Sequence, residues 1–508
     1  MRNQSNNKRI AKNSILLTIR LVITMCITLY TSRVVLNALG VSDYGIYNVV
    51  GGFVTIFTSL TGSFGRAMSR YMTVDIANND IKEQRQVFSA NFNILLVLSA
   101  VILLFCETVG SWYFTSVINV PVNRYAILNS VFQFYLFSFV SELFKTTGIA
   151  VIIAQEKSNI YALFGIVDSI LKLAIACLLF CSPFDKLVFY SSLYALVSFL
   201  SFLYTFLYCK IKFEGFSYTN DVPKELYKSI FGFASWSLVG MSARVLNTQG
   251  LTLIVNKYCG VIVNAALGIV AQVDASMRQF VNNIGIAVNP QIVKSYATGN
   301  IEYMRTLITF ATKCFSFIVL FYAVPISIEA DYILKLWLGQ VPEYTVPLLR
   351  LTFISTLFIV MAIPLEVAAQ ASGNIRRFQT STSIVLLVTL PVVWLLLKMG
   401  VDVLYVYAIL VLVYLFIVMI QFISTKEITR YKSLEYFANV ILRVVLTALL
   451  SYVIPICVIS QLSSSFVRIC FSVVLTILIT LICILTIGFN KNESKMLLGL
   501  IKSFIKRK

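Results

Sequence analysis

The residues of this chain that could act on a charged molecule are eight ionisable side chains standing inside long apolar segments. They are Arg20, Glu142, Lys145, Asp168, Lys172, Arg244, Asp274 and Arg278. On an insertion scale, each would cost about 2.5 to 3.5 kcal/mol if it faced lipid. We therefore expect all eight to face the protein interior or a water-filled cavity.

Six of the eight are spaced for ion pairs along a single helix, because residues three or four apart share a helix face. The pairs are Glu142 with Lys145, Asp168 with Lys172, and Asp274 with Arg278. Two interpretations stay open: the pairs serve a transported molecule, or they only neutralise each other and brace the helices. Arg20 and Arg244 have no acidic residue at such a spacing, so they are the stronger candidates for binding a transported molecule.

The eight residues carry five positive and three negative charges. A basic excess suits an anionic group such as a diphosphate, which arginine can bind through two parallel hydrogen bonds. Gln272, Ser276, Gln279 and Asn283 add a polar stripe, which could hydrogen-bond sugars, water or a neighbouring helix. We predict a central cavity whose substrate-binding residues are Arg20, Arg244, Arg278, Lys145, Lys172, Gln272 and Gln279, with Glu142, Asp168 and Asp274 as coupling or charge-pair acids.

Several kinds of chemistry are disfavoured by the composition. The chain has no histidine, which excludes histidine-based triads and the H-E-x-x-H metal motif. Its ten cysteines are scattered singly, so we interpret them as small buried apolar residues. No phosphate-binding G-x-x-x-x-G-K sequence is present. We expect no metal, no cofactor and no enzymatic activity.

Six further charges stand nearer the ends of apolar segments: Arg33, Lys313, Arg350, Glu366, Arg443 and Arg468. Long side chains at such positions can extend to the lipid headgroups. We expect these residues to do so and leave them out of the site.

The elements that must position these residues are membrane-spanning helices. Of the 508 residues, 58% are hydrophobic and 12% are charged, whereas a soluble domain carries about 25% charged residues. Apolar runs predict an all-α polytopic membrane protein with about fourteen transmembrane helices. They are expected near 14–37, 43–64, 88–114, 126–153, 160–181, 187–209, 229–257, 261–288, 307–328, 348–371, 380–400, 403–424, 437–460 and 466–488.

The loops differ in charge between the two sides of the membrane. On the N-terminal side lie 26 of the 41 basic residues, against five on the other side. By the positive-inside rule, both termini are predicted to be cytoplasmic. The net charge of +19 is therefore a topology signal and gives no support to nucleic-acid binding.

An internal repeat is indicated by two short patterns. N-A-L-G at 37–40 recurs as N-K-Y-C-G at 256–260, so that Asn256 follows Asn37 by 219 residues. A-Q-E-K at 154–157 corresponds to A-S-G-N at 371–374, with an offset of 217. The offset contains an even number of spans, so both copies would insert in the same orientation.

The repeat predicts two six-helix lobes followed by an appendix. We expect an N-terminal lobe over 1–209, a cytoplasmic linker over 210–228, a second lobe over 229–424, and two additional helices with a basic tail over 425–508.

Two stretches have a familiar pattern: LGVSDYGIYNVVGG at 39–52 and SFGRAMSRY at 63–71. They resemble the start of bacterial lipopolysaccharide, O-antigen and capsule repeat-unit flippases of the Wzx type, in the multidrug/oligosaccharidyl-lipid/polysaccharide (MOP) exporter superfamily. The resemblance implies a MATE-like, two-lobed alternating-access transporter of the bacterial inner membrane. Its cargo would be an undecaprenyl-diphosphate-linked oligosaccharide, moved from the cytoplasmic to the periplasmic leaflet.

The resemblance also suggests partners and a role for the last two helices. Beyond the lipid-linked oligosaccharide and membrane lipids, a polysaccharide polymerase and chain-length proteins of the same pathway are candidate partners. Two extra C-terminal spans are similar to those of lipid II flippases, where they border a groove for the lipid tail. The alternatives are a multidrug or organic-cation antiporter of the same superfamily, and a membrane polysaccharide polymerase or glycosyltransferase.

Overall fold

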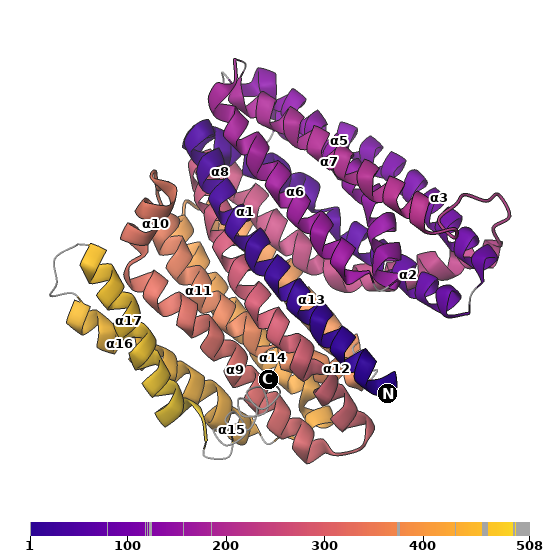
Figure 1. The fold of residues 1–508 in the computed structure, drawn as a ribbon. Coiled ribbons are helices and arrows are strands. Elements are labelled where there is room, and N and C mark those ends of the chain that lie inside the picture. Colours follow the sequence, from indigo (N-terminus) through magenta and orange to yellow (C-terminus); the bar gives the residue numbers. More distant parts are fainter. Residues whose placement is uncertain are drawn as a thin grey trace. The chain divides into compact units, whose positions relative to one another are not determined.

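The computed structural model describes residues 2–490 and 493, apart from 79, 117, 119, 121–123, 156, 184, 373–375, 432 and 460–465, and the part it describes contains helices and no strand (Figure 1). The α-helices are α1 (Arg2–Thr55), α2 (Thr58–Ala77), α3 (Ile81–Phe105), α4 (Ser111–Ser116), α5 (Tyr125–Ala154), α6 (Ser158–Leu178), α7 (Lys186–Lys212), α8 (Lys224–Ala297), α9 (Ile301–Ile328), α10 (Ala330–Leu338), α11 (Thr345–Met361), α12 (Ile363–Ala371), α13 (Arg376–Lys398), α14 (Val403–Thr429), α15 (Ser433–Tyr436), α16 (Arg443–Ile459) and α17 (Phe466–Cys483). Single π-helical segments extend α3, precede α16 and follow α17.

The predicted number of spans agrees with the structure. In the described part, twelve helical stretches are long and apolar enough to cross a membrane. Two of them contain a break, at Gly40 in α1 and at Gly260 in α8. Each break falls between two of the predicted spans, so twelve stretches are consistent with the predicted total of about fourteen.

Gly40 and Gly260 share an unusual backbone conformation. Their φ and ψ angles are 79° and 170° at Gly40, and 78° and −176° at Gly260. This region is essentially restricted to glycine. The two glycines end the first of the two sequence patterns that indicated the repeat, so this pattern corresponds to one local structure that occurs twice.

Replacing Gly40 by alanine is expected to destabilise the protein by about 1 to 3 kcal/mol, because a side chain forces strain at this φ and ψ. No atom lies within 4 Å of the added Cβ, so a clash would not explain the loss. Gly232 is the matched control, since its Cβ also meets open space but its backbone is helical. Thermal unfolding in detergent checks the prediction, and equal effects at Gly40 and Gly232 would contradict it.

The chain divides into two compact units of contacting residues. Unit 1 comprises 1–268, 337–342 and 393–398, and unit 2 comprises 269–336, 343–392 and 399–508. The predicted lobes, linker and appendix stay a prediction, because these units are defined by contacts and not by the repeat.

In unit 1, α5 packs along α7 and α1 packs along α6 (Figure 1). A core of aromatic rings forms where the second part of α1 meets α4 and α5. Phe114 contacts Phe53 and Phe132 there, with ring centroids 5.4 and 4.7 Å apart. The segment after α7 lies against α3, since the ring of Phe216 is tilted against that of Phe88 with centroids 4.3 Å apart. Aromatic contacts therefore join α1, α4 and α5, and they join the segment after α7 to α3.

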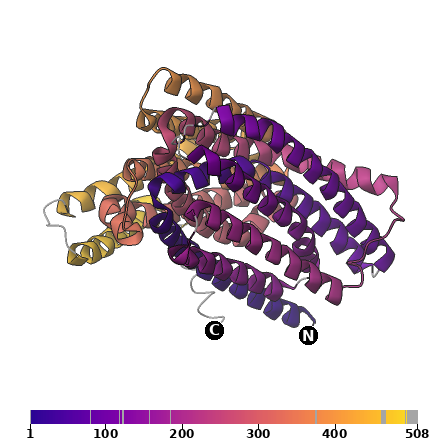
Figure 2. The ribbon, with the colours of Figure 1, turned by 90° about the horizontal axis from the view of Figure 1, so that it is seen from above.

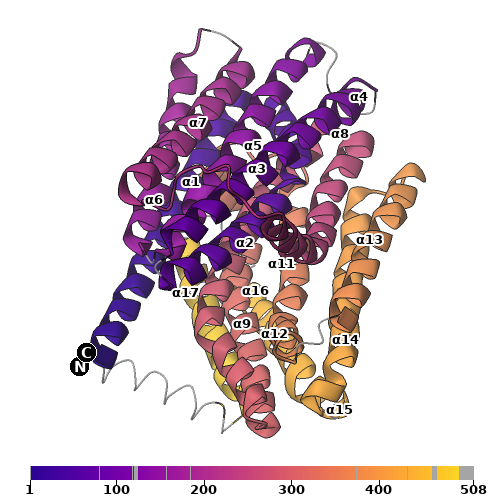
Figure 3. The ribbon, with the colours of Figure 1, turned by 90° about the vertical axis from the view of Figure 1, so that its right-hand side faces the viewer.

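In unit 2, α9 is the central element of the described part. It contacts α11, α16 and α17, and α16 runs beside α17 (Figures 2 and 3). The two additional helices predicted from the sequence therefore pack on α9.

Candidate functional site

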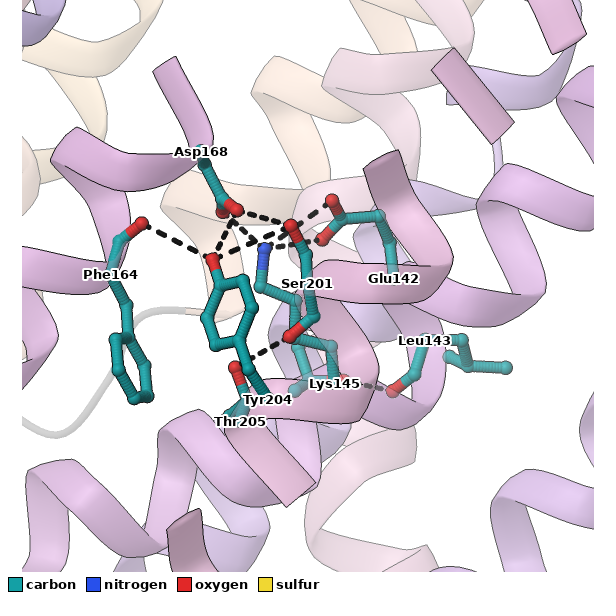
Figure 4. A network of polar contacts seen from close by, with 9 residues as sticks. Glu142, Leu143, Lys145, Phe164, Asp168, Ser201, Tyr204 and Thr205 are labelled. Carbon is teal, nitrogen blue, oxygen red and sulfur yellow. Dashed lines mark hydrogen bonds and ion pairs between the residues drawn. The ribbon is translucent and has the colours of Figure 1, made fainter. Parts of the chain in front are cut away.

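A buried polar network joins three helices of unit 1. Lys145 of α5, Asp168 of α6, and Ser201 and Tyr204 of α7 point toward one another (Figure 4). The Lys145 Nζ lies 2.5 Å from Asp168 Oδ2. The hydroxyls of Ser201 and Tyr204 both donate to Asp168 Oδ1. Both carboxylate oxygens of Asp168 are thus engaged by the protein.

The charged side chains of the network differ in how far they are exposed. The Lys145 side chain is 9% exposed and that of Asp168 is 16% exposed, whereas Glu142 is 37% exposed. Glu142 lies 3.4 Å from the same Nζ. One ammonium group therefore serves two carboxylates, and only one of them is well shielded.

The predicted pairing of Asp168 with Lys172 is wrong. Asp168 pairs with Lys145 on a different helix. Lys172 instead lies over the ring of Tyr194, with its Nζ 4.9 Å from the ring centroid. The i,i+4 spacing allowed the pair, but α5 presents a closer ammonium. The predicted Glu142–Lys145 pair is confirmed at 3.4 Å.

Ser201 and Tyr204 were missed in the sequence. The available signal was a run of small polar residues on one face of α7, because Ser198, Ser201 and Thr205 stand three and four residues apart and are buried. A hydroxyl stripe in an apolar helix predicts contacts with a polar neighbour. The stripe alone does not identify the helix or the residue that it contacts.

Arg20 of α1 lies across α6. Its guanidinium carbon is 4.1 Å from the centroid of the Tyr161 ring. A Cβ at Gly165 would come within 2.4 Å of the Arg20 Nε, so glycine makes room for this crossing. Within the described part of the chain, the Nε is buried and has no hydrogen-bond partner. Arg20 is thus held by stacking.

The remaining predicted site residues belong to α8. Arg244, in unit 1, has an exposed side chain. In unit 2, the predicted Asp274–Arg278 pair is confirmed at 2.5 Å, and Thr356 of α11 donates to the same carboxylate. Gln272 is half-buried and Gln279 is exposed. The side chain of Asn283 lies outside the described part.

An apolar groove lies in unit 2 between α9, α11 and α16. Its volume is about 380 Å³. Apolar side chains form nearly all of its lining, including Leu320, Phe353 and Leu449. Arg350 also borders it, with its Nε donating to the Ser327 carbonyl at 3.0 Å. The groove therefore combines an apolar surface with one cation.

The expected extension of Lys313 to the lipid headgroups is wrong. This side chain is 0% exposed, and its Nζ lies 2.8 Å from Glu493 Oε2. Two further contacts fix the last helices of unit 2. Arg468 pairs with Glu329 at 3.1 Å, and Arg443 donates to the Ile487 carbonyl at 3.0 Å. Buried polar contacts therefore join α16 and α17 to the rest of the unit.

Comparison with known proteins gives a fold but no sequence relative. No protein-family model matches the chain, and no curated protein matches it. Among solved structures, the lipid II flippase MurJ in an inward closed conformation has a TM-score of 0.69 at 15% identity, covering 93% of this chain and 98% of that one. An inward-facing multidrug resistance MATE family transporter of the MOP superfamily has a TM-score of 0.67 at 16% identity, covering 82% and 98%. The chain has the MATE and MurJ fold.

The predicted fold class is confirmed by these similarities, and the chain is a multi-pass membrane protein. An outward-facing MATE transporter is also similar, with a TM-score of 0.59 at 15% identity and coverage of 82% and 96%. MurJ covers more of this chain than either MATE structure does. The chain thus has the MATE and MurJ fold, with a polar network in unit 1 and an apolar groove in unit 2.

Proposed function

We propose that this chain is a flippase for an undecaprenyl-diphosphate-linked oligosaccharide, moving an O-antigen or capsule repeat unit from the cytoplasmic to the periplasmic leaflet by alternating access. The apolar groove of α9, α11 and α16 carries the proposal. A cargo with a long hydrocarbon tail needs an apolar surface along the protein, and the groove supplies one with about 380 Å³ of space. The additional helix α16 forms one of its walls.

The comparison with MurJ supports a lipid cargo. MurJ covers 93% of this chain and is described as a lipid II flippase, whereas the MATE structures cover 82%. The larger coverage favours a chain organised like a lipid flippase over one organised like a multidrug transporter.

The charges inside the membrane argue against an organic-cation antiporter. Such a transporter needs an acidic group that its cargo can reach. Here Asp168 is engaged by Lys145 and two hydroxyls, the more exposed Glu142 shares the Lys145 ammonium at 3.4 Å, and Asp274 is engaged by Arg278. A lipid diphosphate instead requires basic groups, and we propose Arg20, Arg244 and Arg278 for that role.

The remaining features of the proposal follow from charge and cargo. The basic loops favour an inner-membrane location with both termini in the cytoplasm. Membrane lipids surround the protein, and a polysaccharide polymerase with its chain-length protein would act on the delivered repeat unit. We propose no enzymatic activity, cofactor or metal for transport.

Deleting the gene in its host tests the proposed cargo. Lipid-linked repeat units are expected to accumulate on the cytoplasmic side while surface polysaccharide is lost, and the wild-type gene should restore both. Normal delivery of repeat units to the periplasm in the deletion strain would overturn the proposal.

Filling the groove is expected to reduce transport strongly while leaving the protein folded. Ala448 borders the groove, and a tryptophan there would occupy space needed by the lipid tail. Ala408→Trp on the exposed face of α14 is the matched control, because it adds the same bulk outside the groove. Surface polysaccharide in the complemented deletion strain measures the effect. Full activity of a folded Ala448→Trp protein would remove the groove from the transport path.

A further inference from the structure

We propose that Lys145 occupies a monovalent-cation site with its own ammonium group, so that this site holds no exchangeable ion in the native protein. The site is built by Asp168, Glu142, Ser201 and Tyr204 (Figure 4). The proposal concerns unit 1 alone and does not depend on which cargo is carried.

The oxygen atoms around Lys145 resemble the donor set of a cation site. Asp168 Oδ2 lies 2.5 Å from the Nζ, and both carboxylate oxygens of Glu142 lie near 3.4 Å. Ser201 and Tyr204 donate to the other Asp168 oxygen, which fixes the carboxylate toward the ammonium. Carboxylate oxygens are ligands that hard cations prefer. Because the nearby Lys172 offsets one of the two negative charges, the position between the carboxylates suits a monovalent cation.

The local charge balance depends on Lys145. Asp168 and Glu142 contribute two negative charges, which Lys145 and the nearby Lys172 offset. The Lys172 ammonium is directed to the Tyr194 ring, so it balances the charge without filling the position between the two acids. Removing the Lys145 side chain would leave one uncompensated negative charge and an empty space where its ammonium was.

This arrangement has a consequence for the role of Asp168. A carboxylate that couples transport to an ion must exchange that ion on each cycle, whereas a covalently attached ammonium cannot leave. Asp168 is therefore a fixed structural acid in the native protein. Substituting Lys145 would convert it into an ion-dependent one.

The experiment restores the missing group from solution. In Lys145→Ala, the deleted atoms correspond to n-propylammonium, which retains the charge and the three carbons beyond Cβ. We expect Lys145→Ala to melt at a lower temperature than wild type, and its melting temperature to rise with the logarithm of propylammonium concentration. Sodium should produce a smaller rise. Wild type should respond to neither at constant ionic strength.

Matched variants separate a filled site from a general effect. Lys145→Met keeps the volume without the charge and should not respond to propylammonium. Lys172→Ala removes the other lysine near the two acids, whose ammonium lies over the Tyr194 ring; because Lys145 still fills the position between the acids, this variant should not respond either. Adding Asp168→Asn to Lys145→Ala should abolish the response. The apparent affinity for propylammonium, taken from the rise in melting temperature, should be at least ten-fold higher for Lys145→Ala than for each control.

Several outcomes would overturn the proposal. One is a folded Lys145→Ala protein whose melting temperature is unaffected by propylammonium and sodium. Another is a wild-type protein whose sodium response disappears with Asp168→Asn. If Lys145→Ala fails to fold, its yield in gel filtration is measured with and without propylammonium during purification. Recovery with propylammonium supports the proposal, and no recovery contradicts it. Gene deletion tests the cargo separately, so the two hypotheses fail independently.

Discussion

Asp168→Ala is expected to lower the free energy of unfolding by about 3 to 5 kcal/mol, because it leaves a shielded ammonium without its main counter-charge. Lys145 is 9% exposed and lies 2.5 Å from Asp168. Glu142 is farther away at 3.4 Å and more exposed, so it cannot replace the lost contact. The Ser201 and Tyr204 hydroxyls would lose their acceptor in the same variant.

Unfolding in detergent measures this loss, and an exposed ion pair of the same unit provides the control. Asp221 pairs with Lys82 at 3.1 Å with 71% of its side chain exposed, so Asp221→Ala should cost about 0 to 1 kcal/mol. The double variant Asp168→Ala with Lys145→Met should recover much of the stability, because no shielded charge remains unpaired. A cost for Asp168→Ala no larger than that for Asp221→Ala would show that the network does not stabilise the fold.

The spans could be predicted from the sequence because each depends on local composition. A run of about 20 apolar residues specifies a membrane helix wherever it lies. The positions of the helix breaks were indicated only by a repeated sequence pattern. Gly40 and Gly260 were visible as a repeated pattern, but their shared positive φ required coordinates.

Ion pairs within a helix could be predicted, and pairs between helices could not. The Glu142–Lys145 and Asp274–Arg278 spacings fix the two groups on one face, and both pairs are present. Asp168 had a lysine at the correct spacing, yet its partner comes from α5. Sequence spacing carries no information on how neighbouring helices are rotated and which faces meet.

Lys313 shows a second limit of the sequence. Its position near the start of a span suggested that its ammonium reaches the headgroups. Its partner Glu493 stands 180 residues later, beyond α17. Only the packing of α17 on α9 brings the two together. A lysine near a span end can therefore be either at the surface or fully buried.

The buried Lys313–Glu493 pair gives the second large effect. Glu493→Ala is expected to lower the free energy of unfolding by about 3 to 5 kcal/mol, because it leaves the Lys313 ammonium, which is 0% exposed, without its counter-charge. The Nζ donates to both Glu493 oxygens, at 3.0 and 2.8 Å, and the backbone N–H of Asn490 also donates to that carboxylate at 2.7 Å. The variant therefore loses three hydrogen bonds as well as the charge pair.

A double variant separates the pair from the packing around it. Lys313→Met combined with Glu493→Leu should be far more stable than Glu493→Ala alone, since replacing a buried pair by apolar residues is often close to neutral. Glu427→Ala is the surface control in the same unit, because Glu427 is 84% exposed and 3.6 Å from Arg377. The free energies of unfolding of the three variants, measured in detergent, check this order of stability. If Glu493→Ala loses no more free energy of unfolding than Glu427→Ala does, the Lys313–Glu493 pair does not stabilise the fold.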